Sequence, residues 1–225
     1  MTFFRQLWAI ILKDLLSELR SKEMVISMCL FAFLILIIFN FTFDIAPDSI
    51  VGSAPGILWV AFIFSGLMGL GRAFGGERDR GTMPGLLLCP VSGWGIYLAK
   101  LIGTFIFMAI MEVFTLSLFS VLYNVSLISH FFPIVLILFL GTLGFAAVGT
   151  VFSAMSATTK TRDVLLSILV FPISVPMILA SVKATGMVLD GKTLAEAFSW
   201  LKILIAFDML FLLLAYLTFD YILEE

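Results

Sequence analysis

Six long stretches of this sequence contain few charged residues, and each is long enough to cross a membrane. A transmembrane helix needs roughly 20 apolar residues to span the hydrocarbon core. The chain is 62% hydrophobic and 12% charged, whereas soluble domains are about 45–50% apolar and about 25% charged. We therefore predict an all-α integral membrane protein with one transmembrane domain, residues 1–225. Its six transmembrane helices are expected at about 24–43, 57–74, 97–123, 134–153, 164–182 and 200–221.

The first 22 residues are predicted to form an amphipathic helix that lies along the membrane interface. At 100° per residue one face is apolar and the other carries most of the charges. The apolar face holds Phe4, Trp8, Ile11, Leu12, Leu15 and Leu19. A plain extension of the first transmembrane helix is the alternative.

The positions of lysine and arginine predict the orientation in the membrane. Ten of these residues fall in the N-terminal arm and in the second-to-third and fourth-to-fifth connections, against three on the other side. Cytoplasmic loops carry the excess of positive charge, so both termini and residues 75–96 are expected in the cytoplasm. Trp59 then falls at an outer helix end, where interfacial tryptophans gather.

Composition and motifs exclude several classes of function. A net charge of −2 leaves no basic surface for nucleic acid. The sequence shows neither a cluster of His, Asp and Glu nor a Ser–His pairing that would indicate an enzyme. No metal site is expected. Residues 186–193 match the phosphate-loop pattern G-x-x-x-x-G-K-T, but that motif needs a preceding strand and a following helix in an α/β domain. We interpret Asp190-Gly191 as a turn in an outer loop instead.

Residues 75–96, called here the coupling segment, form the most informative connection. Four alternating charges follow two glycines, and a short apolar stretch ends at a proline. Such a segment suits docking into a soluble motor protein, whereas a lipid-headgroup anchor is an equally open alternative. The candidate docking residues are Glu77, Arg78, Asp79, Arg80, Gly81, Leu86, Leu87, Leu88 and Pro90.

Two blocks of sequence resemble a known family. The first is Pro55 to Val60 followed by Glu77-Arg78, Gly81 and the run Leu86 to Pro90. The second is Gly141 to Thr150, Ser153 to Met155, Arg162 to Leu166 and Phe171-Pro172. Together they are similar to the permease of cytochrome c maturation, the haem exporter protein B (CcmB) family of ABC-2 type exporters. Met83-Pro84 departs from the pattern expected after the glycine and threonine.

The resemblance implies a bacterial or archaeal inner-membrane permease subunit without ATPase activity of its own. Its implied partners are a cytoplasmic ATP-binding subunit, other cytochrome c maturation membrane proteins and a second copy of the chain. The family would use ATP on the partner to export haem or to release a haem-loaded chaperone, with no cofactor bound directly to the permease. An ABC-2 exporter for another substrate is the alternative within the class.

Several residues within the spans are further candidates. Glu112 and Asp208 are acids in apolar helices, where a charge costs about 2.5–3.5 kcal/mol. They fit interhelical hydrogen bonds better than a proton relay, and a proton-coupled secondary transporter is a weaker alternative because the chain shows no clear internal repeat. His130 is a haem-ligand candidate, and a solvated loop histidine is the alternative. Small or helix-bending residues for packing or hinges are Gly141, Gly144, Gly149, Pro172 and Pro176.

Overall fold

The computed structural model describes residues 3–42, 47–79, 81–82, 85, 88, 91–123, 130–156 and 161–224. Within these residues the chain is helical, and six helices are long and apolar enough to cross a membrane. The helices are α1 (Phe3–Ser21), α2 (Glu23–Thr42), α3 (Pro47–Ala73), α4 (Gly75–Asp79), α6 (Gly93–Tyr123), α7 (Phe131–Ser156), α8 (Arg162–Leu189) and α9 (Phe198–Glu224). The predicted all-α, six-span architecture is confirmed.

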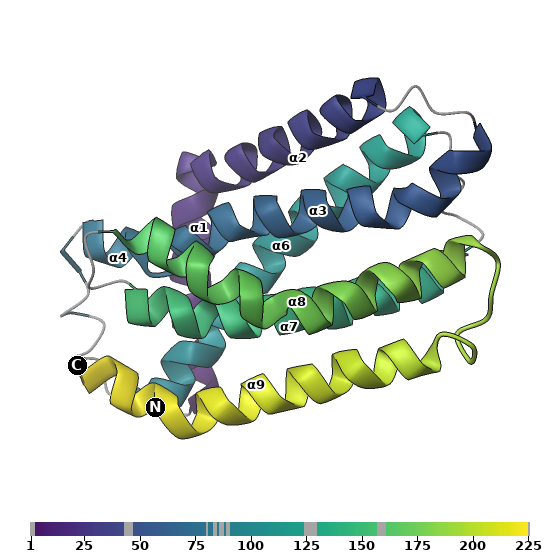
Figure 1. Ribbon diagram of the computed structural model, residues 1–225. Coiled ribbons are helices and arrows are strands. Elements are labelled where there is room, and N and C mark those ends of the chain that lie inside the picture. The colour runs from purple at the N-terminus through teal and green to yellow at the C-terminus, as the bar shows by residue number, and fades with distance from the viewer. Residues whose placement is uncertain are drawn as a thin grey trace.

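Both termini and α4 lie at the same end of the helix bundle (Figure 1). We call this end the termini end. The long helices run alongside one another. Helix α1 crosses the bundle at the termini end and does not form one continuous helix with α2 (Figure 1). The backbone turns at Lys22, whose φ is 56°, and the Glu18 carboxylate accepts hydrogen bonds from the Met24 and Val25 amides at 2.8 and 3.0 Å. A side chain of α1 thereby caps the N-terminus of α2.

Helices α3 and α7 form the centre of the bundle. They bury the largest share of their spanning segments, whereas α2 and α9 bury the smallest. Helix α7 packs against α3, α6, α8 and α9. The polar outer coat of a soluble bundle is absent from the described spans, whose exposed side chains are mostly large and apolar, as contact with lipid requires.

Small residues on α7 allow this close packing. A Cβ added at Gly141 would meet the Trp59 ring and lie 2.8 Å from the Ser181 hydroxyl, and one at Gly149 would collide with the Leu70 side chain. Trp59 is therefore not the interfacial residue that the sequence predicted. It is 2% exposed and donates its indole N–H to the Thr185 hydroxyl at 3.0 Å. The residue lies within α3 and not at the helix end where the sequence predicted it.

Helix α1 precedes the spans, as predicted, and exposes part of its apolar face. Phe4, Trp8 and Leu19 are exposed, whereas Ile11 is buried where α1 packs on α6. The start of α1 comes close to α6 because Gly95 has no side chain: a Cβ there would lie 3.1 Å from the Phe3 ring.

Helix α8 contains Pro172 and Pro176, the two prolines considered as helix-bending residues. Its ribbon changes direction along its length (Figure 1). It continues through Leu189, seven residues beyond its predicted end at 182. Gly191 then stops the helix with φ 80°, and the Lys192 amide donates to the Met187 carbonyl at 2.9 Å. This is the hydrogen-bond pattern of a helix C-terminus closed by glycine. The G-x-x-x-x-G-K-T letters therefore encode a helix end and not a strand followed by a phosphate loop.

Candidate functional site

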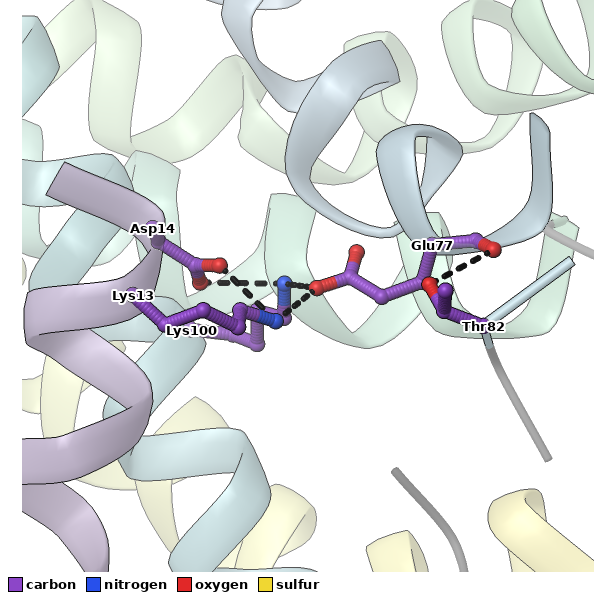
Figure 2. Close-up of polar contacts among 5 residues, drawn as sticks. All are labelled: Lys13, Asp14, Glu77, Thr82 and Lys100. Carbon is purple, nitrogen blue, oxygen red and sulfur yellow. Dashed lines mark hydrogen bonds and ion pairs between the residues drawn. The ribbon is translucent and has the colours of Figure 1, made fainter. Parts of the chain in front are cut away.

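Four charged side chains from three separate helices meet beside α4 (Figure 2), which lies at the termini end (Figure 1). They are Lys13 and Asp14 of α1, Glu77 of α4 and Lys100 of α6, and we call them the charge cluster. Lys13 and Lys100 both point toward the Glu77 carboxylate (Figure 2). The two ammonium groups each lie 2.5 Å from the same oxygen, Oε1 of Glu77.

Asp14 closes the network on the other side. Its Oδ2 lies 3.0 Å from the Lys100 ammonium, and its Oδ1 lies 3.1 Å from the Lys13 ammonium. Two positive and two negative charges therefore balance within one contact shell. Buried charges are tolerated when they are paired and hydrogen-bonded in this way.

The members of the cluster differ in burial. The Lys100 and Glu77 side chains are 3% and 8% exposed, whereas Lys13 is 49% exposed. Burial alone would lower the pKa of Lys13, but the ion pairs with Glu77 and Asp14 outweigh it and raise that pKa above its ordinary value. Lys13 therefore stays positively charged at neutral pH, at the accessible edge of the cluster.

Neighbouring groups hold Glu77 in place. The backbone N–H of Thr82 donates to the Glu77 carbonyl at 2.7 Å, and the Thr82 hydroxyl donates to the same carbonyl at 3.2 Å. Gly81 permits this tight turn because its φ is 65°, a conformation that glycine adopts without strain. On the other side, the Lys100 ammonium lies 5.3 Å from the centre of the Phe74 ring, within the range of a cation–π contact.

A large cavity opens beside the charge cluster. Its volume is about 1300 Å³, and α1, α3, α6 and the first turns of α2 and α8 contribute to its lining. All four cluster residues line it, together with apolar side chains such as Met24, Leu67, Phe107 and Leu166. The site therefore offers an amphiphile both apolar and charged side chains.

Comparison with known proteins identifies the family of this chain. The model of the CcmB protein family matches residues 5–224. The chain belongs to the CcmB family. It is 27% identical over 177 residues to Heme exporter protein B of Pseudomonas aeruginosa, a match that covers 77% of this chain and 78% of the relative. It is 25% identical over 170 residues to Heme exporter protein B of Haemophilus influenzae, which covers 76% of each.

Only part of the predicted coupling segment of this CcmB-family chain can be placed. Arg80, Leu86, Leu87 and Pro90 lie outside the described residues, and Arg78 and Asp79 are described only as part of the α4 backbone. Leu88 is exposed. The last four residues of the segment, 93–96, already belong to α6.

The structure changes the interpretation of Glu77 itself. We predicted that its charge contacts a partner protein, but the carboxylate is buried and bonded to two lysines of the same chain. Sequence reasoning missed Lys13, Asp14 and Lys100 as functional candidates. One signal was available, since a lysine at position 100 lies inside a mostly apolar helix, and such residues commonly have a partner.

The two intramembrane acids lie on either side of α7. Glu112 of α6 accepts a hydrogen bond from the Thr142 hydroxyl, which is an interhelical contact of the kind expected. Asp208 of α9 is 4% exposed, and neither carboxylate oxygen has a hydrogen-bond partner among the described residues. A Cβ at Gly144 would lie 2.5 Å from an oxygen of Asp208, so this glycine makes room for the acid. Asp208 therefore makes no hydrogen bond with Glu112, and the roles of both acids stay predictions.

His130 lies just before α7 and is half-buried, and it does not line the cavity beside the charge cluster. In the part of the chain that the structure describes, no three His, Cys, Asp or Glu side chains gather to hold a metal ion. Haem ligation by His130 stays a prediction.

Proposed function

We propose that this chain is the membrane subunit of a haem-export system for cytochrome c maturation, driven by ATP hydrolysis on a separate cytoplasmic subunit. The family match over nearly the whole chain and the name of the relatives, Heme exporter protein B, support the haem-export role. The chain is a multi-pass membrane protein of bacterial type and belongs in the inner membrane. It assembles with other maturation proteins and with a second copy of itself.

In this proposal the termini end faces the cytoplasm. The N-terminal arm and the connection from Arg72 to Lys100 carry eight of the chain's 13 lysines and arginines, and α1 and α4 lie at this end (Figure 1). The orientation is tested with Cys89 after Cys29 is replaced. An impermeant thiol reagent should label Cys89 only in permeabilised cells, and labelling in intact cells would reverse the orientation.

The observation that carries the coupling role is the attachment of Glu77 to two other helices. Because its carboxylate joins Lys13 of α1 and Lys100 of α6, α4 is fastened to both. A force applied to the coupling segment by an ATP-binding subunit would reach α1 and α6 through these ion pairs. Glu77 thus transmits the force to α1 and α6, and Arg78 to Pro90 are the residues proposed to contact the partner.

The experiment separates partner binding from transmission. Glu77→Gln should retain the copurified ATP-binding subunit but lower the yield of c-type cytochromes, because the partner still docks on a segment that is no longer held. Arg78→Ala together with Asp79→Ala should lose both. Lys202→Gln, on α9 away from the termini end, is the matched control and should keep both.

Two results would contradict the proposal. Normal c-type cytochrome yield in a strain that lacks this chain would exclude the maturation role and favour an ABC-2 exporter for another substrate. Normal yield together with normal copurification in both test variants would reduce the coupling segment to a membrane anchor.

A further inference from the structure

The arrangement of Lys13 and Lys100 is a binding site for a carboxylate that Glu77 presently fills. Both ammonium groups lie 2.5 Å from one Glu77 oxygen, and charge-assisted contacts of this kind do not depend on which molecule carries the carboxylate. We propose that a carboxylate of haem, bound in the neighbouring cavity, displaces Glu77 from Lys13 and Lys100 and so releases the coupling segment. This inference rests on the proposed haem-export function.

The cavity is suited to such a ligand. Its volume of about 1300 Å³ exceeds the roughly 300–1,000 Å³ of common small-molecule sites. Haem combines a large apolar ring with carboxylates at one edge. The cavity lining includes apolar side chains such as Leu67, Phe107 and Leu166, which suit the ring, and also Lys13 and Lys100, which suit the carboxylates.

Charge balance makes the exchange feasible. The cluster holds two lysines against Asp14 and Glu77, so its net charge is zero. If a ligand carboxylate takes the place of Glu77, the buried charge is unchanged, and no lysine is left unpaired. The same contacts form on both sides of the exchange, so the apolar side chains of the lining provide most of the binding free energy.

Accessibility favours Lys13 as the first contact. Its side chain is 49% exposed, whereas that of Lys100 is 3% exposed. A ligand from the cavity therefore meets Lys13 first and reaches Lys100 as Glu77 leaves. Once Glu77 is displaced, α4 keeps its covalent connection to α3 but loses its ion pairs with α1 and α6 until Glu77 returns to the two lysines. The force proposed to pass through these pairs therefore acts as Glu77 returns and the ligand carboxylate leaves.

The exchange predicts opposite effects from residues of one cluster. Glu77→Gln removes the competing carboxylate and should tighten haem binding by about tenfold, since the ligand gains a charge-assisted contact without displacing one. Lys13→Gln should weaken binding by about tenfold for the converse reason. Asp14→Asn should also tighten binding and serves as a second variant if Glu77→Gln does not fold.

The measurement is a haem titration of the full chain in phosphatidylcholine nanodiscs, read as the Soret difference from protein-free nanodiscs. Size-exclusion profiles establish that each variant is folded, and Lys202→Gln is the control for removal of a lysine outside the cavity. Haem dimethyl ester, which lacks free carboxylates, should bind more weakly than haem and with the same affinity to wild type and Glu77→Gln.

Three outcomes would overturn the inference. These are shifts of the same sign in folded Glu77→Gln, Asp14→Asn and Lys13→Gln, equal binding of haem and its dimethyl ester, or loss of haem binding when phosphatidylglycerol is added. The last result would assign the lysines to an anionic lipid headgroup. If any of these results is obtained while the yield of c-type cytochromes still requires the chain, the haem-export proposal stands and only this inference fails. If the yield does not require the chain, the proposed function itself is overturned.

Discussion

Replacing Lys100 by methionine should destabilise the chain far more than the same change at Lys13. Lys100 is 3% exposed and lies against both Glu77 and Asp14, so its loss leaves two carboxylates with one lysine. Removing one partner of a buried ion pair costs about 3–5 kcal/mol. Lys13 is 49% exposed, and an ion pair at that exposure contributes about 0–1 kcal/mol.

Thermal unfolding of the purified chain in detergent measures this difference. For a chain of this size each kcal/mol corresponds to roughly 2–4 °C in Tm, so Lys100→Met should lower Tm by about 6–20 °C. Lys13→Met should lower it by no more than about 4 °C.

A double-mutant cycle tests the electrostatic cause. Glu77→Gln in the Lys100→Met background removes one negative charge together with the positive one, and the remaining Lys13 and Asp14 form a balanced pair. The double variant should therefore be more stable than the sum of the two single effects by about 0.5–3 kcal/mol. Additive effects, or equal Tm losses from Lys100→Met and Lys13→Met, would refute the reasoning that the cluster is a coupled buried network.

Three other perturbations address packing, the phosphate-loop pattern and pH. Gly141→Leu should destabilise the bundle by about 1–3 kcal/mol in thermal unfolding, because any side chain there meets the buried Trp59 ring and overpacks the core; an unchanged Tm would contradict this packing. Lys192→Ala should leave ATP-dependent c-type cytochrome yield intact, whereas Gly191→Ala should cost about 1 kcal/mol because φ is 80° there and favours glycine; ATP binding by the isolated chain that Lys192→Ala abolished would restore the phosphate-loop interpretation. The folded-state pKa of Lys13 lies above its ordinary value, so the contribution of Lys13 to stability is complete below the ordinary value and is lost as pH rises through the folded-state value. The fall in Tm at alkaline pH should therefore be smaller in Lys13→Met than in the wild type. An identical fall in the two proteins would show that the protonation of Lys13 is not linked to folding.

The membrane architecture was predictable from the sequence because it depends on local properties. The length and hydropathy of each stretch decide whether a helix can cross the bilayer, and all six predicted spans overlap helices in the structure. The amphipathic period of residues 3–21 likewise indicated α1. Even the false phosphate-loop pattern was resolved by local context, since an apolar helix precedes Gly191 where a strand would be needed.

The charge cluster could not be predicted in the same way, because it depends on where α1 crosses the bundle. Lys13 and Glu77 are 64 residues apart in sequence, and Glu77 and Lys100 are 23 apart. No periodicity or motif links these positions. Trp59 shows the same limit, since its place near a predicted helix end indicated the interface until the fold buried it against Thr185. Local hydropathy thus predicts which segments enter the membrane, whereas the pairing of charges depends on the fold, because helices distant in sequence must meet at one point in space.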